Sequence, residues 1–170
     1  MDVKTMARIL VAYATKHGST AEIAQAIRKE LLAAGHIIDV MEMGTVASLE
    51  GYNAVIIGGP MYLGKMVGAG KFVGRLADEL KKLPVAAFIV GISPVSKDPT
   101  SMEYTEKALH AALSPLQPVV EAMFAGRLDP AGLSWLENWM TKKAKSPVGD
   151  FRDWTAIAAW ARELPAKMGI

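Results

Sequence analysis

The chain of 170 residues has no cysteine. Disulfide scaffolds, zinc ribbons, thiolate-held iron–sulfur clusters and cysteine nucleophiles are therefore excluded, and any redox chemistry must belong to a bound organic cofactor. Long apolar runs are also missing. The run 9–14 is too short for the core of a secretory signal, and no stretch reaches the ~18 apolar residues that span a membrane. We therefore expect a cytoplasmic protein.

A large excess of charge of either sign is missing as well. The chain has 19 Lys and Arg residues against 17 Asp and Glu residues, which gives a net charge of +2. Nucleic-acid-binding domains usually carry a strongly basic face, so no nucleic-acid partner is expected. The length and the 51% of hydrophobic residues predict a single globular domain over residues 1–170.

Apolar strands alternate with amphipathic helices along the chain. The predicted strands are 9–14, 37–41, 54–60, 85–90 and 119–124, and the predicted helices are 20–32, 71–83, 100–113 and 153–167. Strands that are apolar throughout are buried on both faces, which requires helices on both sides of a parallel sheet. The pattern therefore predicts an α/β fold, a doubly wound five-stranded sheet of order 2-1-3-4-5.

One segment, 126–150, does not fit this minimal plan. Its middle part, 130–145, predicts an additional helix that carries Trp135 and Trp139. Three lysines follow at positions 142, 143 and 145. Tryptophan is favoured at the headgroup interface and lysine attracts anionic lipid, so we expect peripheral membrane contact through 133–145. The alternative is an ordinary helix packed on the edge of the sheet.

Ligands of such sheets bind beyond the carboxyl ends of the strands, where the strand order reverses. The first loop at this place carries three hydroxyls and one glycine and leads directly into a helix. Hydroxyls, backbone amides and the positive end of a helix dipole suit a phosphate monoester. The predicted phosphate-binding residues are Thr15, Lys16, His17, Gly18, Ser19 and Thr20. The alternative is a plain turn in which one hydroxyl caps the helix.

Two further loops offer contacts for a planar ring. The second loop has an aromatic and two apolar side chains flanked by glycines, which let the backbone approach a ring edge. Its predicted contact residues are Pro60, Met61, Tyr62, Leu63 and Gly64, and the third loop adds Gly91 and Ser93 as polar contacts for the ring edge. A half-buried surface position for Tyr62 is the alternative. A phosphate site beside a ring slot indicates a mononucleotide with a large flat ring, FMN.

Other phosphate-binding patterns fit less well. The first loop has one glycine where a dinucleotide-binding G-x-G-x-x-G needs three. The segment 64–71 has Lys65 in place of the first glycine of a nucleoside-triphosphate loop, and Phe72 replaces the magnesium-binding hydroxyl. We predict no metal site and assign no catalytic side chain.

The two main loops resemble signatures of the flavodoxin family. Residues 11–20, VAYATKHGST, are similar to its phosphate loop, aromatic-x-[ST]-x-x-G-x-T, and residues 56–64, IIGGPMYLG, are similar to its second flavin loop. Tyr62 stands where the family places an aromatic against the isoalloxazine. The segments 125–127 and 151–164 further resemble the quinone-dependent, menaquinone-type protoporphyrinogen oxidase branch. The resemblance implies a flavodoxin-like fold, FMN, and oxidation of protoporphyrinogen IX coupled to quinone reduction in heme biosynthesis.

Charge separates this oxidoreductase hypothesis from a second one, an electron carrier that shuttles between redox partner proteins. Shuttle flavodoxins are typically acidic around the flavin, and acidic surroundings disfavour the anionic reduced flavin. The stretch 51–77 contains no acid and has Lys65, Lys71 and Arg75 instead. We therefore expect a less negative potential and favour an enzyme whose partners are a small redox substrate or quinone. A weak FMN binder that acts through partners is a third possibility.

Overall fold

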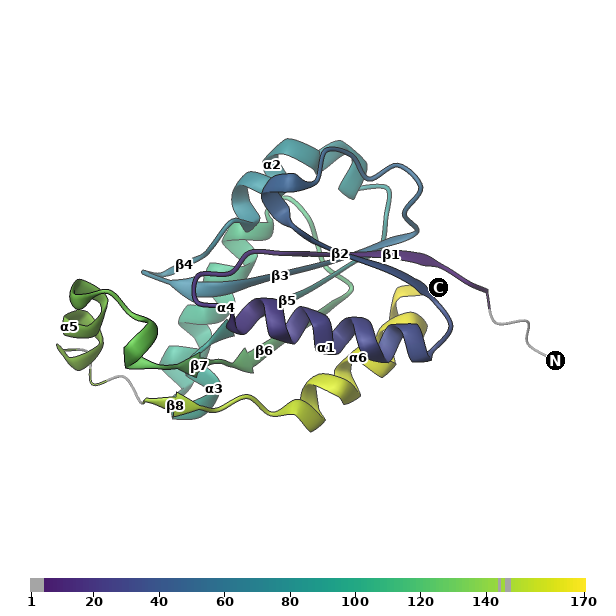
Figure 1. Ribbon diagram of the computed structural model, residues 1–170. Helices are drawn as coiled ribbons and strands as arrows, with labels where there is room; N and C mark the ends of the chain where they lie inside the picture. Colours follow the sequence, from purple (N-terminus) through teal and green to yellow (C-terminus); the bar gives the residue numbers. More distant parts are fainter. Residues whose placement is uncertain (1–4, 144, 146–147) are drawn as a thin grey trace.

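A computed structural model describes residues 5–143, 145 and 148–170, and a central sheet runs through it (Figure 1). Its strands are β1 Arg8–Tyr13, β2 Ile37–Glu42, β3 Ala54–Tyr62, β4 Lys65–Met66, β5 Val85–Gly91 and β6 Val120–Ala125. Five of them are parallel in the order β2-β1-β3-β5-β6, and β4 pairs antiparallel with the end of β3. Strand β4 is not one of the parallel strands, so β5 and β6 are the fourth and fifth of them. The predicted order 2-1-3-4-5 is therefore confirmed.

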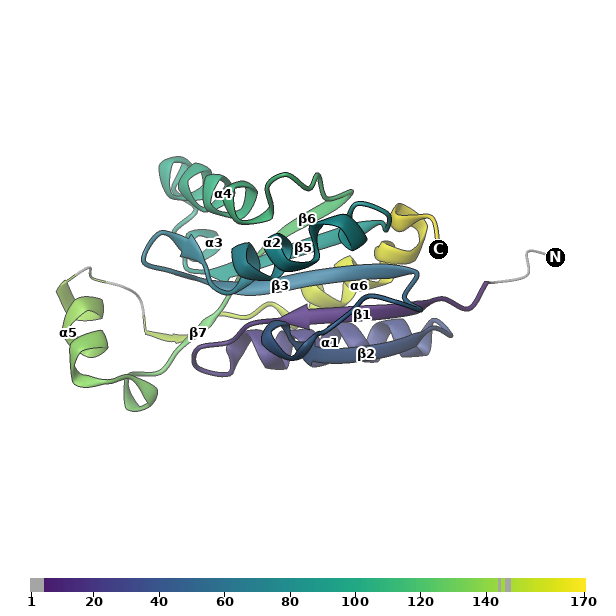
Figure 2. The same cartoon turned by 90° about the horizontal axis from the view of Figure 1, so that it is seen from above.

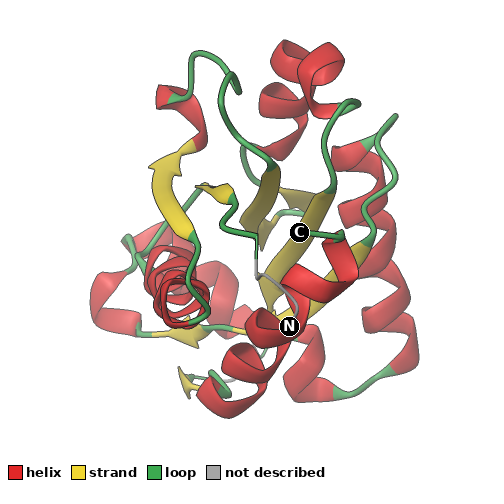
Figure 3. Cartoon of the chain, turned by 90° about the vertical axis from the view of Figure 1, so that its right-hand side faces the viewer, coloured by secondary structure: helices red, strands yellow, loops and turns green. Residues whose placement is uncertain are grey.

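Two layers of helices enclose this sheet. The four long helices are α1 Ser19–Ala33, α2 Ala69–Leu80, α4 Pro99–Leu113 and α6 Trp154–Met168. Helices α1 and α6 cover one face, and α2 and α4 cover the other (Figure 2). Figure 3 views the molecule from the end opposite the cavity described below and shows helices on both sides of the strands. The predicted doubly wound α/β class is therefore confirmed.

The alternation of side chains along a strand explains why the inner strands β1, β3 and β5 are largely apolar. In β1, Ile9 and Val11 pack with α1 and α6, whereas Leu10 and Ala12 pack with α2 and α4. Successive side chains point to opposite faces, so a strand between two helical layers needs apolar residues at every position. All four of these side chains have no exposed surface.

An aromatic cluster fills the core beneath α6. Phe88 of β5 lies 5.9 Å from Phe124 and 6.0 Å from Trp160, measured between ring centroids, and the contact with Trp160 is edge-to-face. Phe88 is fully buried. Its ring lies over Gly58 of the neighbouring strand β3, where a Cβ atom would come within 2.0 Å of Phe88 Cζ. The cluster therefore depends on a glycine at position 58.

Residues 126–150 form an arm beyond the carboxyl ends of the strands (Figure 1). It contains β7 Arg127–Leu128, the 3₁₀ turn η2 Pro130–Gly132, α5 Trp135–Lys143 and β8 Gly149–Asp150, and β7 pairs antiparallel with β8. The predicted helix 130–145 is thus shorter in the structure, and positions 144, 146 and 147 lie outside the described residues. Helix α5 begins after Ser134 because the Ser134 hydroxyl accepts a hydrogen bond from the amide of Glu137 at 3.2 Å.

Arg152 connects the base of the arm with helix α1. Its guanidinium donates hydrogen bonds to both carboxylate oxygens of Asp150, at 2.8 and 2.7 Å, and also to Glu22 of α1. It lies over the ring of Trp154 at 4.6 Å from the centroid. The Arg152 side chain is only 5% exposed, so its charge requires these partners.

Because Asp150 pairs with Arg152, we expect the free energy of unfolding to depend on pH in the acid range. Hydrogen bonds from Arg152 lower the pKa of Asp150 from 3.8 to about 2. A carboxylate with a lowered pKa in the folded state stabilises fully above its unfolded pKa and loses that contribution as the pH falls towards the folded value. Because Asp150 is 44% exposed, solvent screening limits the gain to about 1 kcal/mol.

We therefore expect Asp150→Asn to lower the free energy of unfolding by up to about 1 kcal/mol above about pH 5. The difference from the wild type should shrink between about pH 4 and pH 2. Urea unfolding followed by circular dichroism over this pH range measures it. If the difference in the free energy of unfolding between variant and wild type stayed constant down to pH 2, the lowered pKa of Asp150 would be contradicted.

Candidate functional site

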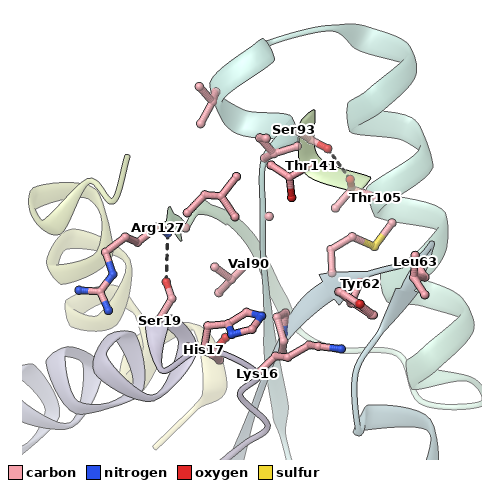
Figure 4. A pocket seen from close by; sticks show the side chains of 18 of the residues that line it. Lys16, His17, Ser19, Tyr62, Leu63, Val90, Ser93, Thr105, Arg127 and Thr141 are labelled. Atoms are coloured by element: carbon pink, nitrogen blue, oxygen red, sulfur yellow. Dashed lines mark hydrogen bonds between the residues drawn. The ribbon is translucent and has the colours of Figure 1, made fainter. Parts of the chain in front are cut away.

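A cavity of about 560 Å³ opens at the carboxyl ends of β1, β3 and β5, between the sheet and the arm (Figure 4). The structure brings nearly all of the predicted site residues around it. Those that line it are Thr15, Lys16, His17, Ser19, Thr20, Pro60, Met61, Tyr62, Leu63, Gly64, Gly91 and Ser93. Among the predicted residues, all of which are described, Gly18 alone lies outside the lining.

Gly18 acts through its backbone conformation. It is the N-cap of α1 with φ of 86°, in the left-handed region that favours glycine, and its amide donates to Thr15 Oγ1 at 2.9 Å. No side chain in the described part of the chain caps α1. The loop is therefore not a plain turn in which a hydroxyl caps the helix. Ser19 Oγ instead accepts a hydrogen bond from the amide of Arg127 at 3.2 Å (Figure 4).

Thr20 carries an unsatisfied hydroxyl at the start of α1. The residue is 1% exposed and lines the cavity, yet its Oγ1 has no hydrogen-bond partner among the described residues. A buried hydroxyl left unpaired costs roughly 1–3 kcal/mol. The amides of the first turn of α1 are also available there, and the helix dipole favours an anion. This donor set fits a phosphate monoester and identifies the phosphate end of the cavity.

The ring end of the cavity is formed by the hairpin of β3 and β4. Strand β3 continues to Tyr62, beyond the predicted end at Pro60, because Tyr62 pairs with Lys65. Leu63 and Gly64 make the turn with φ of 48° and 77°, which is the two-residue hairpin geometry with both residues left-handed. Leu63 is 69% exposed at the tip. The hairpin thus presents Met61, Tyr62 and Leu63 to the cavity.

Lys16 lies against the Tyr62 ring. Its Nζ is 3.3 Å from the ring centroid, a cation–π contact that Figure 4 shows as the lysine extending towards the tyrosine. The positive charge of Lys16 is therefore located at the ring end of the cavity, although the residue belongs to the phosphate loop.

The Ser93 hydroxyl, a predicted polar contact for the ring edge, already has hydrogen-bond partners within the protein. Ser93 opens the short helix α3 Ser93–Ser96, and the residue is 4% exposed. Its Oγ lies 2.8 Å from Ser101 Oγ and also bonds to Thr105 Oγ1. The hydroxyl is engaged in this internal network because α4 packs directly against α3. Ser93 lines the cavity, but its hydroxyl is already satisfied.

Two cations of the acid-free stretch 51–77 lie away from the cavity lining. Lys71 and Arg75 belong to α2, and neither is among the described residues that line the cavity. The Arg75 guanidinium donates instead to the carbonyl oxygens of Met43, at 2.7 Å, and of Val46. Lys65 pairs with Tyr62 through the backbone of the hairpin, and Lys16 places its ammonium group against the Tyr62 ring.

The arm contributes lining residues that the sequence did not predict. They are Arg127, Leu128, Leu133, Glu137, Met140 and Thr141, and α4 adds Tyr104 and Thr105. The arm residues gave one signal in the sequence, a segment too long for a simple connection, whereas Tyr104 and Thr105 gave none. The arm, which lies beyond the carboxyl ends of the strands, thus forms a second wall of the cavity.

Glu137 makes a direct contact across this cavity. Its Oε2 lies 2.7 Å from Nε2 of His17, and Ser134 Oγ donates to its Oε1 at 3.1 Å. Partial burial raises the pKa of Glu137, but the hydrogen bonds from His17 and Ser134 outweigh it and lower the pKa below its usual value. Glu137 is therefore an ionised acceptor at neutral pH.

The described residues contain neither a membrane-spanning helix nor a cluster of metal ligands. None of their helices is long and apolar enough to cross a membrane. No group of three or more His, Cys, Asp or Glu residues within them could hold a metal ion.

Comparison with known proteins gives a family match and a similar protein. A family model described as a flavodoxin domain matches residues 10–154. The chain is also similar to protoporphyrinogen IX dehydrogenase (quinone) of Escherichia coli (strain K12), with 27% identity over 172 residues that cover 92% of this chain and 94% of that protein.

Solved structures show the same fold. A flavodoxin from the domain Archaea has a TM-score of 0.55 and 14% identity, covering 96% of this chain and 99% of that one. The flavodoxin of Streptococcus pneumoniae TIGR4 has a TM-score of 0.56 and 16% identity, covering 95% and 99%. At these identities the likeness concerns the fold.

Proposed function

The chain belongs to the flavodoxin family, and from this premise we propose that it is an oxidoreductase that uses FMN to oxidise protoporphyrinogen IX and reduce a quinone. FMN binding follows from the family, and the cavity fits it. When bound, FMN supplies the redox chemistry, and the protein supplies binding, orientation and electrostatics.

Each part of the cavity has a role in holding FMN. The Thr20 hydroxyl and the first amides of α1 receive the phosphate, since the hydroxyl has no partner and no side chain caps this helix start among the described residues. The hairpin residues Met61, Tyr62 and Leu63 provide the surface for the ring. Lys16 at that surface places positive charge beside it, which favours the reduced, anionic form of a flavin.

The observation that carries the proposal is the second wall of the cavity. Leu133 and Met140 of the arm line it together with Tyr62. A carrier that passes electrons to a docked protein needs only an exposed ring edge, whereas an enzyme needs space for a small substrate. The similarity to the E. coli protein, named for porphyrinogen and quinone, extends over 92% of this chain and supports the same substrates.

Activity with both substrates tests the proposal. In each step the porphyrinogen would lose two electrons and two protons, and the quinone would take up the same to become a quinol. We expect the FMN-loaded protein, under anaerobic conditions, to release fluorescent porphyrin only when a menaquinone analogue is present. The flavin-free protein is the control. Failure to turn over porphyrinogen, together with rapid reduction by a partner reductase, would favour the carrier alternative.

We further propose that the outer face of the arm rests on an anionic membrane from the cytoplasmic side, where a quinone is accessible. Trp135 is 81% and Trp139 54% exposed. The described cations beside them are Lys142, Lys143 and Lys145, and Lys143 lies over the Trp139 ring at 4.9 Å. None of the residues of α5, all of them described, is buried, so the helix is free to offer this face.

Vesicle sedimentation tests the membrane contact. Replacement of the three arm lysines by glutamine should weaken binding to phosphatidylserine-containing vesicles by up to about a hundredfold, at ~1 kcal/mol for each lysine. The matched control replaces Lys29, Lys81 and Lys82, which are exposed outside the arm. Equal losses in the two triple variants would indicate general charge attraction and contradict a role of the arm.

A further inference from the structure

We propose that Glu137 is a positioning residue for the FMN phosphate: from the arm, it holds the His17 imidazole at the phosphate loop. The inference rests on FMN binding and is independent of the substrate. It concerns a pair that is 120 positions apart in the sequence and that meets across the cavity.

The geometry fixes both partners of the pair. His17 Nε2 and Glu137 Oε2 are 2.7 Å apart, and their side chains are 33% and 19% exposed. The Ser134 hydroxyl holds the other carboxylate oxygen at 3.1 Å, so the carboxylate is bound on two sides. His17 and Glu137 line the same cavity as Thr20, whose hydroxyl has no partner among the described residues.

The chemistry of the pair leaves one ring nitrogen for a ligand. An ionised carboxylate can only accept, so Nε2 of His17 must carry a proton. Nδ1 makes no hydrogen bond with any residue that the structure describes. In the protonated imidazole both nitrogens are donors, and Nδ1 can then donate to a phosphate oxygen.

Neighbouring cations do not take this place. Lys16, next in the chain, has its ammonium group 3.3 Å from the Tyr62 ring centroid. Figure 4 shows Lys16 and His17 running in different directions and the Arg127 guanidinium pointing away from the His17 ring. Of the three basic residues that line the cavity in the described structure, Lys16, His17 and Arg127, His17 is therefore the one whose ring remains at the phosphate loop. The two adjacent residues 16 and 17 thus serve opposite ends of the flavin.

The experiment compares FMN with riboflavin, which has the same ring and lacks the phosphate. Dissociation constants come from the quenching of flavin fluorescence by the flavin-free protein. We expect His17→Gln to weaken FMN binding about tenfold and Glu137→Gln roughly three- to tenfold, with riboflavin unchanged. Ser134→Ala should act in the same direction with a smaller effect. Glu163→Gln on α6 is the control and should leave the FMN-to-riboflavin ratio unchanged.

The double variant distinguishes positioning from a structural role. If Glu137 acts through His17, the variant with both substitutions should bind FMN as His17→Gln alone does. Additive losses would overturn the proposal, and so would an equal loss of FMN and riboflavin affinity in Glu137→Gln. Because the readout is a ratio of two affinities, it does not depend on any enzymatic activity.

Discussion

Replacement of Thr20 by valine is expected to stabilise the flavin-free protein while weakening FMN binding by one to two orders of magnitude. The two effects have one cause. The Thr20 hydroxyl is buried and has no partner among the described residues, so its removal relieves a cost of roughly 1–3 kcal/mol. A hydrogen bond to a charged phosphate is worth about 1.5–3 kcal/mol, which corresponds to roughly a 10- to 150-fold change in affinity.

Thermal unfolding without flavin and titrations with FMN and riboflavin measure both effects. The matched control is Thr105→Val, at a buried position that lines the same cavity but whose hydroxyl bonds to Ser93 and Ser101. This control should destabilise the flavin-free protein and should not discriminate FMN from riboflavin. If Thr20→Val lowers the stability of the flavin-free protein and leaves FMN affinity intact, the hydroxyl has no phosphate role.

Gly58→Ala should be the most destabilising small substitution in the sheet. The new Cβ atom would lie 2.0 Å from Phe88 Cζ, and Phe88 cannot withdraw because Phe124 and Trp160 pack against it. Overpacking of a close-packed core costs typically 1–3 kcal/mol or more. We expect a loss at or above the upper end of that range, since the obstacle is a buried ring.

Gly74→Ala provides the matched control for this prediction. Gly74 lies within α2, and a Cβ atom there meets nothing within 4 Å. The same chemical change should therefore stabilise by about 0.5–1 kcal/mol, because alanine is the better helix former. Urea unfolding of both variants gives the comparison. Similar free energies of unfolding in the two would show that the Phe88 ring can move aside.

The sheet order could be predicted from the sequence because its signal is local and repeated. The inner strands β1, β3 and β5 are largely apolar, as in 9–13, and an amphipathic helix follows β1 directly. Strand β4 could not be predicted in this way. It has only two residues, and it exists because the turn at Leu63 and Gly64 brings Lys65 beside Tyr62.

In the site, too, features with a local sequence signal could be predicted, and features that depend on the path of the chain could not. The phosphate loop could be recognised because Thr15, Gly18 and Thr20 belong to one loop and one helix start. Nearness in sequence to Tyr62 does not bring Lys71 and Arg75 to the cavity, because both belong to α2 and neither is among the described residues that line it. Glu137 could not be assigned, since its position depends on the path of the whole arm.

The pairing of β7 with β8 means that the arm leaves and rejoins the fold at a single point. Leu128 lies opposite Gly149, and Arg127 lies opposite Asp150. A chain that departs and returns side by side can change in length without altering the spacing of the elements it connects. The arm is thus separable from the rest of the fold. Residues 129–148 could be replaced by a short turn, or by the arm of a relative, without changing the sheet and helices that form the flavin-binding domain.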